Sequence, residues 1–178
     1  MPRVFTGLEL PPDIRLRLSL FRAPLNGAHW IEPENMHLTL RFAGDIDDQA
    51  ADTFAELLAD IRMAPFEIRI AGTGAFGGRK PTVVYADVET HPALDALFRA
   101  NDRAARASGL EPQPHAFKPH VTLARMRNGR PLAVAQFLET SGDLRLGPIP
   151  VERFALFSAR PGSGGGPYVI EESYPLVA

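Results

Sequence analysis

The feature that most constrains this chain is a four-residue motif, His-x-Thr-Leu, that occurs twice. Residues 35–42 are Asn-Met-His-Leu-Thr-Leu-Arg-Phe, and residues 117–125 are Phe-Lys-Pro-His-Val-Thr-Leu-Ala-Arg. Both segments alternate apolar and polar residues and contain the residue types that favour strands. Side chains two positions apart on a strand share one face. Each motif therefore predicts a strand that places a histidine beside a threonine, with the intervening apolar residues directed to a core.

The two motifs divide the chain into similar halves. Their histidines, His37 and His120, are separated by close to half of the 178 residues. Each half is predicted to run strand, helix, motif strand, helix, strand. Two such halves packed about a pseudo-twofold axis would bring the motifs opposite each other across a cleft. We therefore expect a single α+β domain over residues 1–178, made of two pseudo-repeated lobes.

The remaining elements follow from hydrophobic periodicity and from the positions of Pro and Gly. Strands are predicted at 3–10, 30–31, 35–45, 66–72, 82–88, 117–125, 144–146, 150–158 and 168–171. Helices are predicted at about 11–21, 47–63, 91–108 and 131–138. Residues 73–81 form a predicted loop around Phe76, where substrate-specific variation is expected. Residues 162–166 are predicted to be the turn of a closing hairpin.

Composition narrows the possible classes of protein. The chain contains no cysteine, which excludes disulfides and is typical of a reducing cytoplasm. No apolar run is long enough for a membrane span, no signal sequence is recognised, and the net charge of −2 argues against a general nucleic-acid coat. Residues 112–138 nevertheless lack Asp and Glu and carry six basic or titratable groups, which favours an anionic ligand there: His115, Lys118, His120, Arg125, Arg127 and Arg130.

Other kinds of site are not predicted. The motifs contain no carboxylate and the chain has no cysteine, so we expect no metal site. The glycine-rich segments do not match a P-loop, and there is no G-x-S-x-G elbow. His29 and His115 are interpreted as solvated loop residues, and His91 as the start of a helix.

Two histidines and two threonines suit the cleavage of a phosphodiester. A neutral imidazole accepts a proton and an imidazolium donates one near physiological pH. A pair on opposite sides of a phosphorus atom supplies a base for the nucleophile and an acid for the leaving oxygen. The hydroxyls of Thr39 and Thr122 would donate hydrogen bonds to the non-bridging oxygens. This scheme requires neither a metal nor an organic cofactor.

The doubled motif and its flanks resemble the 2H phosphoesterase superfamily, and within it the LigT-like RNA 2′,3′-cyclic phosphodiesterases, also called 2′-5′ RNA ligases. The resemblance covers nearly the whole chain, from the strand at 3–5 and Trp30 through both motifs to Phe157 and the segment 168–176. It implies a bilobal fold in which two antiparallel sheets line a central cleft with helices outside. It also implies hydrolysis of RNA 2′,3′-cyclic phosphodiester ends to 2′-phosphomonoesters without a metal.

The resemblance assigns roles to the motif residues. His37 is expected to donate a proton to the departing 3′ oxygen, and His120 to accept one from water. Thr39 and Thr122 are expected to hold the phosphate. Some members of the family also join RNA ends through a 2′-5′ bond, with a 5′-hydroxyl in place of water.

Five further residues are predicted to bind substrate: Arg41, Phe42, Phe76, Arg125 and Tyr168. Strand alternation places Arg41 on the face of His37. It places Arg125 opposite His120, so that contact with a phosphate would need a bend in the strand, and a structural ion pair is the alternative. The three aromatic residues are candidates for stacking on a base, with core packing as the alternative for each.

The expected partner is RNA with 2′,3′-cyclic phosphate ends, tRNA fragments being one candidate, and the expected state is a cytoplasmic monomer. Two alternatives stay open at this point. One keeps the chemistry but takes small cyclic nucleotides or ADP-ribose cyclic phosphate. The other is a non-catalytic module that binds RNA ends. Intact His-Thr pairs argue against the second, because binding alone needs positive charge and not groups that titrate near neutral pH.

Overall fold

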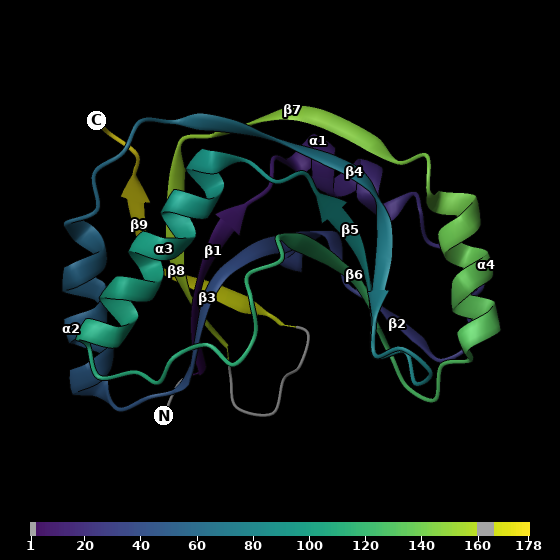
Figure 1. Ribbon diagram of the computed structural model, residues 1–178, viewed down its shortest axis with the longest axis horizontal. Coiled ribbons are helices and arrows are strands. Elements are labelled where there is room, and N and C mark those ends of the chain that lie inside the picture. Colours follow the sequence, from purple (N-terminus) through teal and green to yellow (C-terminus); the bar gives the residue numbers. More distant parts are fainter. Residues whose placement is uncertain (1–2, 160–165) are drawn as a thin grey trace.

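The computed structural model describes residues 3–159 and 166–178, which form β-strands with helices between several of them (Figure 1). Its strands are β1 Arg3–Glu9, β2 Ala28–Trp30, β3 His37–Asp45, β4 Phe66–Phe76, β5 Val83–Val88, β6 His120–Met126, β7 Arg145–Val151, β8 Arg153–Ala159 and β9 Tyr168–Pro175. Its helices are α1 Pro12–Ser19, the 3₁₀ turn η1 Pro33–Asn35, α2 Asp48–Ala59, α3 Pro92–Ala107 and α4 Pro131–Ser141.

The strands form one antiparallel sheet, in which equivalent strands of the two halves lie at equal distances from the centre. The order is β7-β4-β5-β6-β3-β1-β8-β9, and β2 pairs with β6 beside this path. The motif strands β3 and β6 lie at the centre and are joined through the pair Leu38 and Val121. Outward from β3 lie β1, β8 and β9, and outward from β6 lie β5, β4 and β7. The predicted pair of antiparallel lobes is therefore present, joined at its centre into a continuous sheet.

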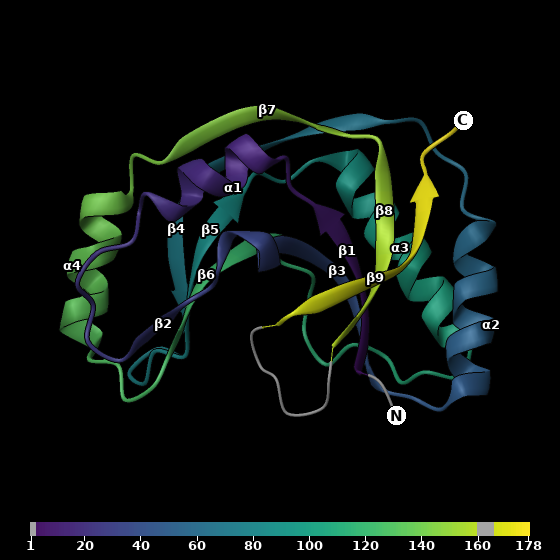
Figure 2. The same ribbon diagram turned by 180° about the vertical axis from the view of Figure 1, so that it is seen from behind.

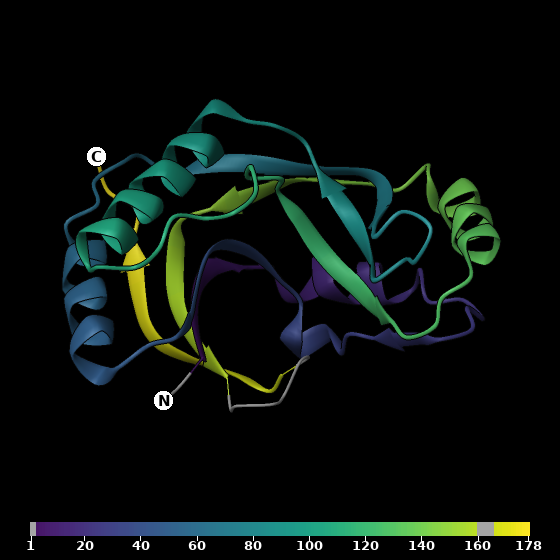
Figure 3. The ribbon, with the colours of Figure 1, turned by 60° about the horizontal axis from the view of Figure 1, so that its bottom comes forward.

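Helices cover the two ends of this sheet. Helices α2 and α3 lie over the lobe of β1, β3, β8 and β9, whereas α4 and α1 lie over the lobe of β4–β7 (Figures 1 and 2). The view in Figure 3 separates α4 at one end from α2 and α3 at the other. The sequence prediction of helices outside two strand lobes is confirmed.

A continuous hydrophobic core lies beneath the helices. Leu38, Val121, Phe54 and Leu97 are essentially inaccessible to solvent and belong to the main cluster. Burial of such side chains contributes roughly 1.5–3 kcal/mol each to folding. The alternate positions of the motif strands are left for polar groups, as the sequence pattern predicts.

Several element boundaries differ from the sequence prediction: α2 ends at Ala59 rather than near residue 63, α4 continues to Ser141 rather than 138, and β7 spans Arg145–Val151 rather than 144–146. β4 continues through residues 73–76, predicted as a loop, because that segment pairs with β5 from Thr73 to Phe76. β9 extends to Pro175, since residues 172–175 pair with β8 although their side chains do not alternate clearly. His29 lies on the short strand β2 rather than in a loop. The predicted turn at 162–166 lies largely outside the described residues.

No helix in the described part of the chain is long and apolar enough to cross a membrane.

Candidate active site

The central strand pair brings both motifs to one place. β3 and β6 are antiparallel with Leu38 opposite Val121, so His37 lies next to the position of Thr122, and Thr39 next to that of His120. Leu38 and Val121 are fully buried in the core. Side chains one position away on each strand must therefore point to the opposite face. All four motif side chains share that face, as predicted.

Both imidazoles are fixed in the same way. The Nδ1–H of His37 donates to the carbonyl oxygen of Asn35 at 2.8 Å, and the Nδ1–H of His120 donates to that of Lys118 at 2.7 Å. A carbonyl oxygen only accepts, so each Nδ1 carries the proton in the neutral ring. Each histidine thus keeps Nε2 for chemistry. In His37 this nitrogen is 3.0 Å from the hydroxyl oxygen of Thr39.

His37 is held neutral in the free protein. Its pKa is lowered to about 4, chiefly by burial and also by the positive charges of Arg125 and His120, although the hydrogen bond to Asn35 opposes these effects. An imidazolium with so low a pKa gives up its proton readily. A bound anion near Arg125 would reverse part of this effect, because an opposite charge favours the protonated ring.

His120 has a different electrostatic environment. Burial also lowers the pKa of His120, and the Lys118 ammonium adds to this effect, while the hydrogen bond to the Lys118 carbonyl and the carboxylate of Asp87 raise it. Asp87 stands opposite His120 in the pairing of β5 with β6. The negative charge of Asp87 stabilises the protonated form of His120. No carboxylate is among the groups that shift the pKa of His37.

A β-bulge decides where the residues after the first motif point. Between the pairs Thr6–Arg41 and Gly7–Thr39, Leu40 is an extra residue on β3. Leu40 and Arg41 consequently both face the core, with 3% and 2% of their surfaces exposed. The prediction that Arg41 shares the face of His37 is wrong. Its guanidinium is buried, with Nε 2.9 Å from Asp102, and also donates to two backbone carbonyl oxygens.

The same bulge turns Phe42 toward the motif face. Phe42 lines a cavity of about 200 Å³ together with His37 and Thr39, and this phenylalanine is 43% exposed. An aromatic ring that is exposed inside a polar cavity is available to a ligand. The prediction that Phe42 lies at the site agrees with this position, although its role in binding stays a prediction.

A second bulge acts on Arg125. Leu123 is the extra residue on β6 between the pairs Val84–Ala124 and Tyr85–Thr122. The side chain of Arg125 therefore returns to the motif face, where it lines the cavity beside His37. This is the bend that contact between Arg125 and a phosphate requires. The rest of the cavity wall is provided by Arg3, Phe5, Ala159 and Tyr168.

Aromatic rings surround both histidines. Tyr168 is edge-on to His37 with ring centroids 4.9 Å apart, and Phe5 lies 4.8 Å from the same ring. Phe76 is edge-on to His120 at 5.0 Å. Phe76 and Tyr168, predicted as stacking residues for a base, are thus at the site but in contact with the histidine rings.

Tyr85 is a further residue beside His120 that the sequence does not predict. Its ring centroid is 5.2 Å from that of His120 and 4.5 Å from that of Phe76, and the Lys118 ammonium lies 5.6 Å above it. Tyr85 stands opposite Thr122 in the register of β5 and β6. Only that register identifies Tyr85 as a neighbour of His120, because the alternation within residues 82–88 does not show which strand pairs with β5.

Asn35 and Lys118 have similar roles beside the two motif histidines. The backbone carbonyl oxygen of each accepts a hydrogen bond from a histidine two residues later, and the side chain of each holds an aromatic residue against that histidine. The Asn35 amide oxygen accepts a hydrogen bond from the backbone N–H of Tyr168 at 3.4 Å. The Lys118 ammonium lies over Tyr85 and is 3.4 Å from Asp87.

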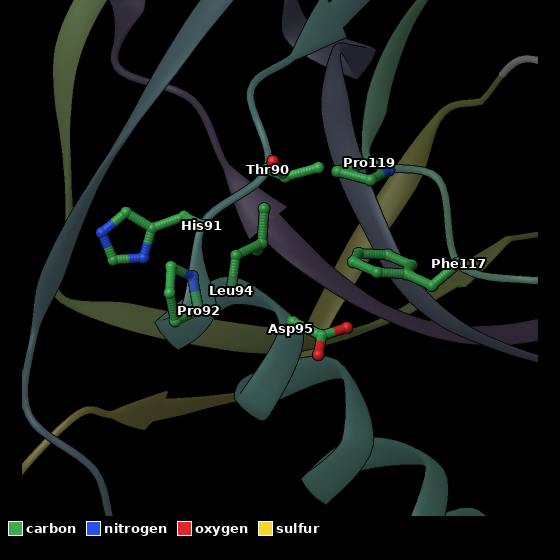
Figure 4. Close-up of a pocket in the computed structure, with 7 residues that line it drawn as sticks. All are labelled: Thr90, His91, Pro92, Leu94, Asp95, Phe117 and Pro119. Carbon is green, nitrogen blue, oxygen red and sulfur yellow. The ribbon is translucent and has the colours of Figure 1, made fainter.

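A separate cavity of about 280 Å³ lies between the start of α3 and the segment that leads to His120 (Figure 4). Leu94, Phe117 and Pro119 form much of its wall. His91 acts there as the N-cap of α3, as predicted, and its Nδ1 accepts a hydrogen bond from the backbone N–H of Ala93 at 3.0 Å. Asp95 is ion-paired with Arg99. The side chains of His91 and Asp95 are therefore engaged in the structure of α3.

Within residues 3–159 and 166–178, no group of three or more His, Cys, Asp or Glu side chains is arranged to hold a metal ion.

Comparison with known proteins identifies the family of this chain. The LigT-like phosphoesterase family matches residues 8–85 and 87–168, which correspond to the two halves. An RNA 2′,3′-cyclic phosphodiesterase of Aeropyrum pernix is 37% identical over 71% of this chain and 73% of its own length. One from Thermus thermophilus is 30% identical over 98% of this chain and 90% of its own.

Solved structures show the same fold. A crystal structure of a protein from Thermus thermophilus has a TM-score of 0.80 at 27% identity and covers 98% of this chain and 97% of that one. Escherichia coli LigT in complex with 3′-AMP has a TM-score of 0.78 at 23% identity and covers 100% of both chains. With two family matches that span nearly all of the sequence, this chain is a member of the LigT-like phosphoesterase family.

Proposed function

We propose that this protein hydrolyses RNA 2′,3′-cyclic phosphodiester ends to 2′-phosphomonoesters by acid–base catalysis with two histidines. The observation that carries the proposal is the sharing of one sheet face by His37, Thr39, His120 and Thr122 through the pair Leu38–Val121. The relatives named RNA 2′,3′-cyclic phosphodiesterase support the same reaction.

In the proposed mechanism His120 is the base. Its Nε2 takes a proton from water while the water oxygen bonds to phosphorus, and Asp87 stabilises the resulting imidazolium. His37 is the acid. Its Nε2–H gives a proton to the 3′ oxygen as the bond from phosphorus to that oxygen breaks, and the low pKa of His37 favours this transfer. Each properly placed group contributes roughly 10²- to 10⁴-fold.

The remaining groups bind the phosphate and the nucleoside. Arg125 lines the cavity beside His37 and supplies positive charge for the non-bridging oxygens. The hydroxyls of Thr39 and Thr122 donate hydrogen bonds to the same oxygens. Phe42 offers an exposed ring on which the terminal base can stack. Substrate approach also raises the pKa of His37, because the anion offsets the charge of Arg125.

The direct test uses an oligonucleotide that ends in a 2′,3′-cyclic phosphate, incubated with the purified protein in EDTA. We expect a product with its phosphate on the 2′ oxygen, identified by ³¹P NMR. His37→Gln and His120→Gln keep a hydrogen-bonding side chain of similar size and should lose at least about 10²-fold in kcat. Circular dichroism and thermal unfolding check that both variants fold. Full activity in either variant would refute the two-histidine mechanism.

A second outcome separates hydrolysis from binding alone. If the oligonucleotide binds but no product forms, the cleft is a recognition site for RNA ends. If only small cyclic nucleotides react, the substrate class is wrong although the chemistry stands. Joining of a 5′-hydroxyl RNA to the cyclic end would show that ligation also occurs.

A further inference from the structure

A second and larger hollow adjoins the catalytic cavity. Its volume is about 490 Å³, and its wall is formed by β2, the two residues that follow it, and the end of β6. Arg125 lines both this hollow and the 200 Å³ cavity that contains His37 and Thr39. The two spaces are therefore neighbours that share Arg125 in their walls. We call the larger one the β2–β6 groove.

The strand register gives the β2–β6 groove a row of basic side chains. His29 stands opposite Arg125 in the pairing of β2 with β6, and the backbone N–H of Arg127 bonds to the carbonyl oxygen of Gly27 at 2.8 Å. Arg127 follows the last residue of β6, and it lines the groove together with Arg125. His29, Arg125 and Arg127 are all exposed.

The other groups in the wall suit a nucleic acid strand. Trp30 is partly exposed, and its ring rests edge-on against Phe137 beneath the groove. Among the described residues, the one carboxylate that lines the groove is Glu32, which is 3.5 Å from the guanidinium of Arg22, and this cation offsets its charge. A positive groove with an aromatic surface is the usual combination in sites for single-stranded nucleic acid.

From this arrangement we propose that the β2–β6 groove binds the nucleotides on the 5′ side of the reacting phosphate. The inference rests on the proposed function. A 2′,3′-cyclic phosphate ends the chain, so an RNA held at His37 and His120 can continue only from its 5′ oxygen. Arg125 then contacts the reacting phosphate, and Arg127 and His29 contact the next phosphate. The protein consequently selects an RNA strand over a cyclic mononucleotide.

The test compares substrates that differ only in length. The probes are uridine 2′,3′-cyclic phosphate and a three- and a five-nucleotide oligouridylate with the same cyclic end. For the unmodified protein we expect kcat/KM to be about 10-fold higher for the trinucleotide than for the mononucleotide, a difference of about 1.4 kcal/mol. In Arg127→Gln the ratio of these two kcat/KM values should fall several-fold. A ratio equal to that of the unmodified protein would overturn the proposal.

Salt dependence gives an independent readout. Each phosphate contact with a single strand contributes about 0.7 to the slope of log kcat/KM against log salt. The slope for the trinucleotide should therefore be about 0.7 less steep in Arg127→Gln. Arg103→Gln removes an exposed positive charge of the same type from α3, and should change neither the ratio nor the slope. An equal change in both variants would show a general charge effect and refute the groove.

The outcomes also separate this inference from the function on which it rests. Turnover of the mononucleotide with no advantage for the oligouridylates overturns the groove and leaves the proposed chemistry intact. An absence of turnover with every cyclic phosphate overturns both.

Discussion

Phe42 and Arg125 occupy equivalent positions in the two halves of the molecule. Each comes five residues after the histidine of its motif, and each is turned into the same cavity by a bulge at the leucine of that motif, Leu40 or Leu123. The repeated backbone thus presents an aromatic ring from one half and a guanidinium from the other. An approximately symmetric frame provides an asymmetric site, as a ligand with a base at one end and a phosphate at the other requires.

The environments of the two histidines lead to a prediction for the pH dependence of activity. The pKa values of both His37 and His120 lie below the ordinary histidine value in the free protein. The reaction needs one ring protonated and one neutral, so kcat/KM should decline as pH rises above about 6.5. The bound anion raises the pKa of His37, and the alkaline limb of kcat should therefore lie at higher pH than that of kcat/KM. Steady-state profiles from about pH 5 to pH 9 measure both; a kcat/KM that rises through about pH 8 would contradict the assignment.

His37 also links stability to pH. Its pKa is about 4 in the folded protein and about 6.5 when unfolded, so the unfolded chain binds more protons between these values. The stabilisation from a neutral His37 is complete above about pH 6.5 and is lost as pH falls toward about 4. Between about pH 8 and pH 5 this loss is about 2 kcal/mol. Urea unfolding at these two pH values measures the loss in each protein. The free energy of unfolding should fall by about 2 kcal/mol more for the unmodified protein than for His37→Gln. Equal losses would mean that the ring is not buried as described.

Arg41 and Arg125 should differ in what they contribute. Arg41→Met removes the buried partner of Asp102, whose carboxylate keeps its ion pair with the more exposed Arg106, and we expect the free energy of unfolding to fall by about 2 kcal/mol. Arg125→Met removes an exposed cation from the cavity, and we expect the free energy of unfolding to change by less than about 0.5 kcal/mol while kcat/KM falls about 10²-fold. Chemical denaturation measures the free energy of unfolding of both variants, and steady-state kinetics measures their kcat/KM. A variant of Arg125 that is active but unstable would assign this residue to structure.

The ring of Tyr85 should position His120. Tyr85→Leu removes the ring that contacts both His120 and Phe76. The imidazole then becomes more exposed, so its pKa should rise toward the ordinary value and kcat should fall. Tyr85→Phe keeps the ring and serves as the control, with both quantities close to those of the unmodified protein. NMR titration of the His120 ring gives the pKa. Unchanged values in Tyr85→Leu would show that the tyrosine only fills space.

A substitution at a glycine beside Tyr85 tests the same contact between Tyr85 and His120. A Cβ atom at Gly74 would lie 2.5 Å from the ring and hydroxyl of Tyr85, so Gly74→Ala forces that ring to move. We expect Gly74→Ala to reproduce the direction of both changes seen in Tyr85→Leu. Normal kinetics in a folded Gly74→Ala protein would argue that the position of Tyr85 is unimportant for catalysis.

Local sequence patterns were sufficient to predict the two motif strands and the repeat, and they are the basis of the proposed chemistry. Alternation is a local property, so Leu38 and Val121 could be assigned to the core, and the histidines and threonines to the opposite face, without a structure. The residues that join them at the site depend on long-range contacts. A bulge interrupts alternation without a clear local signal, and this is why Arg41 turned out to be buried whereas Arg125 reached the cavity. Tyr85 reaches His120 only through the register between β5 and β6, because the partner of a strand is selected by contacts distant in sequence.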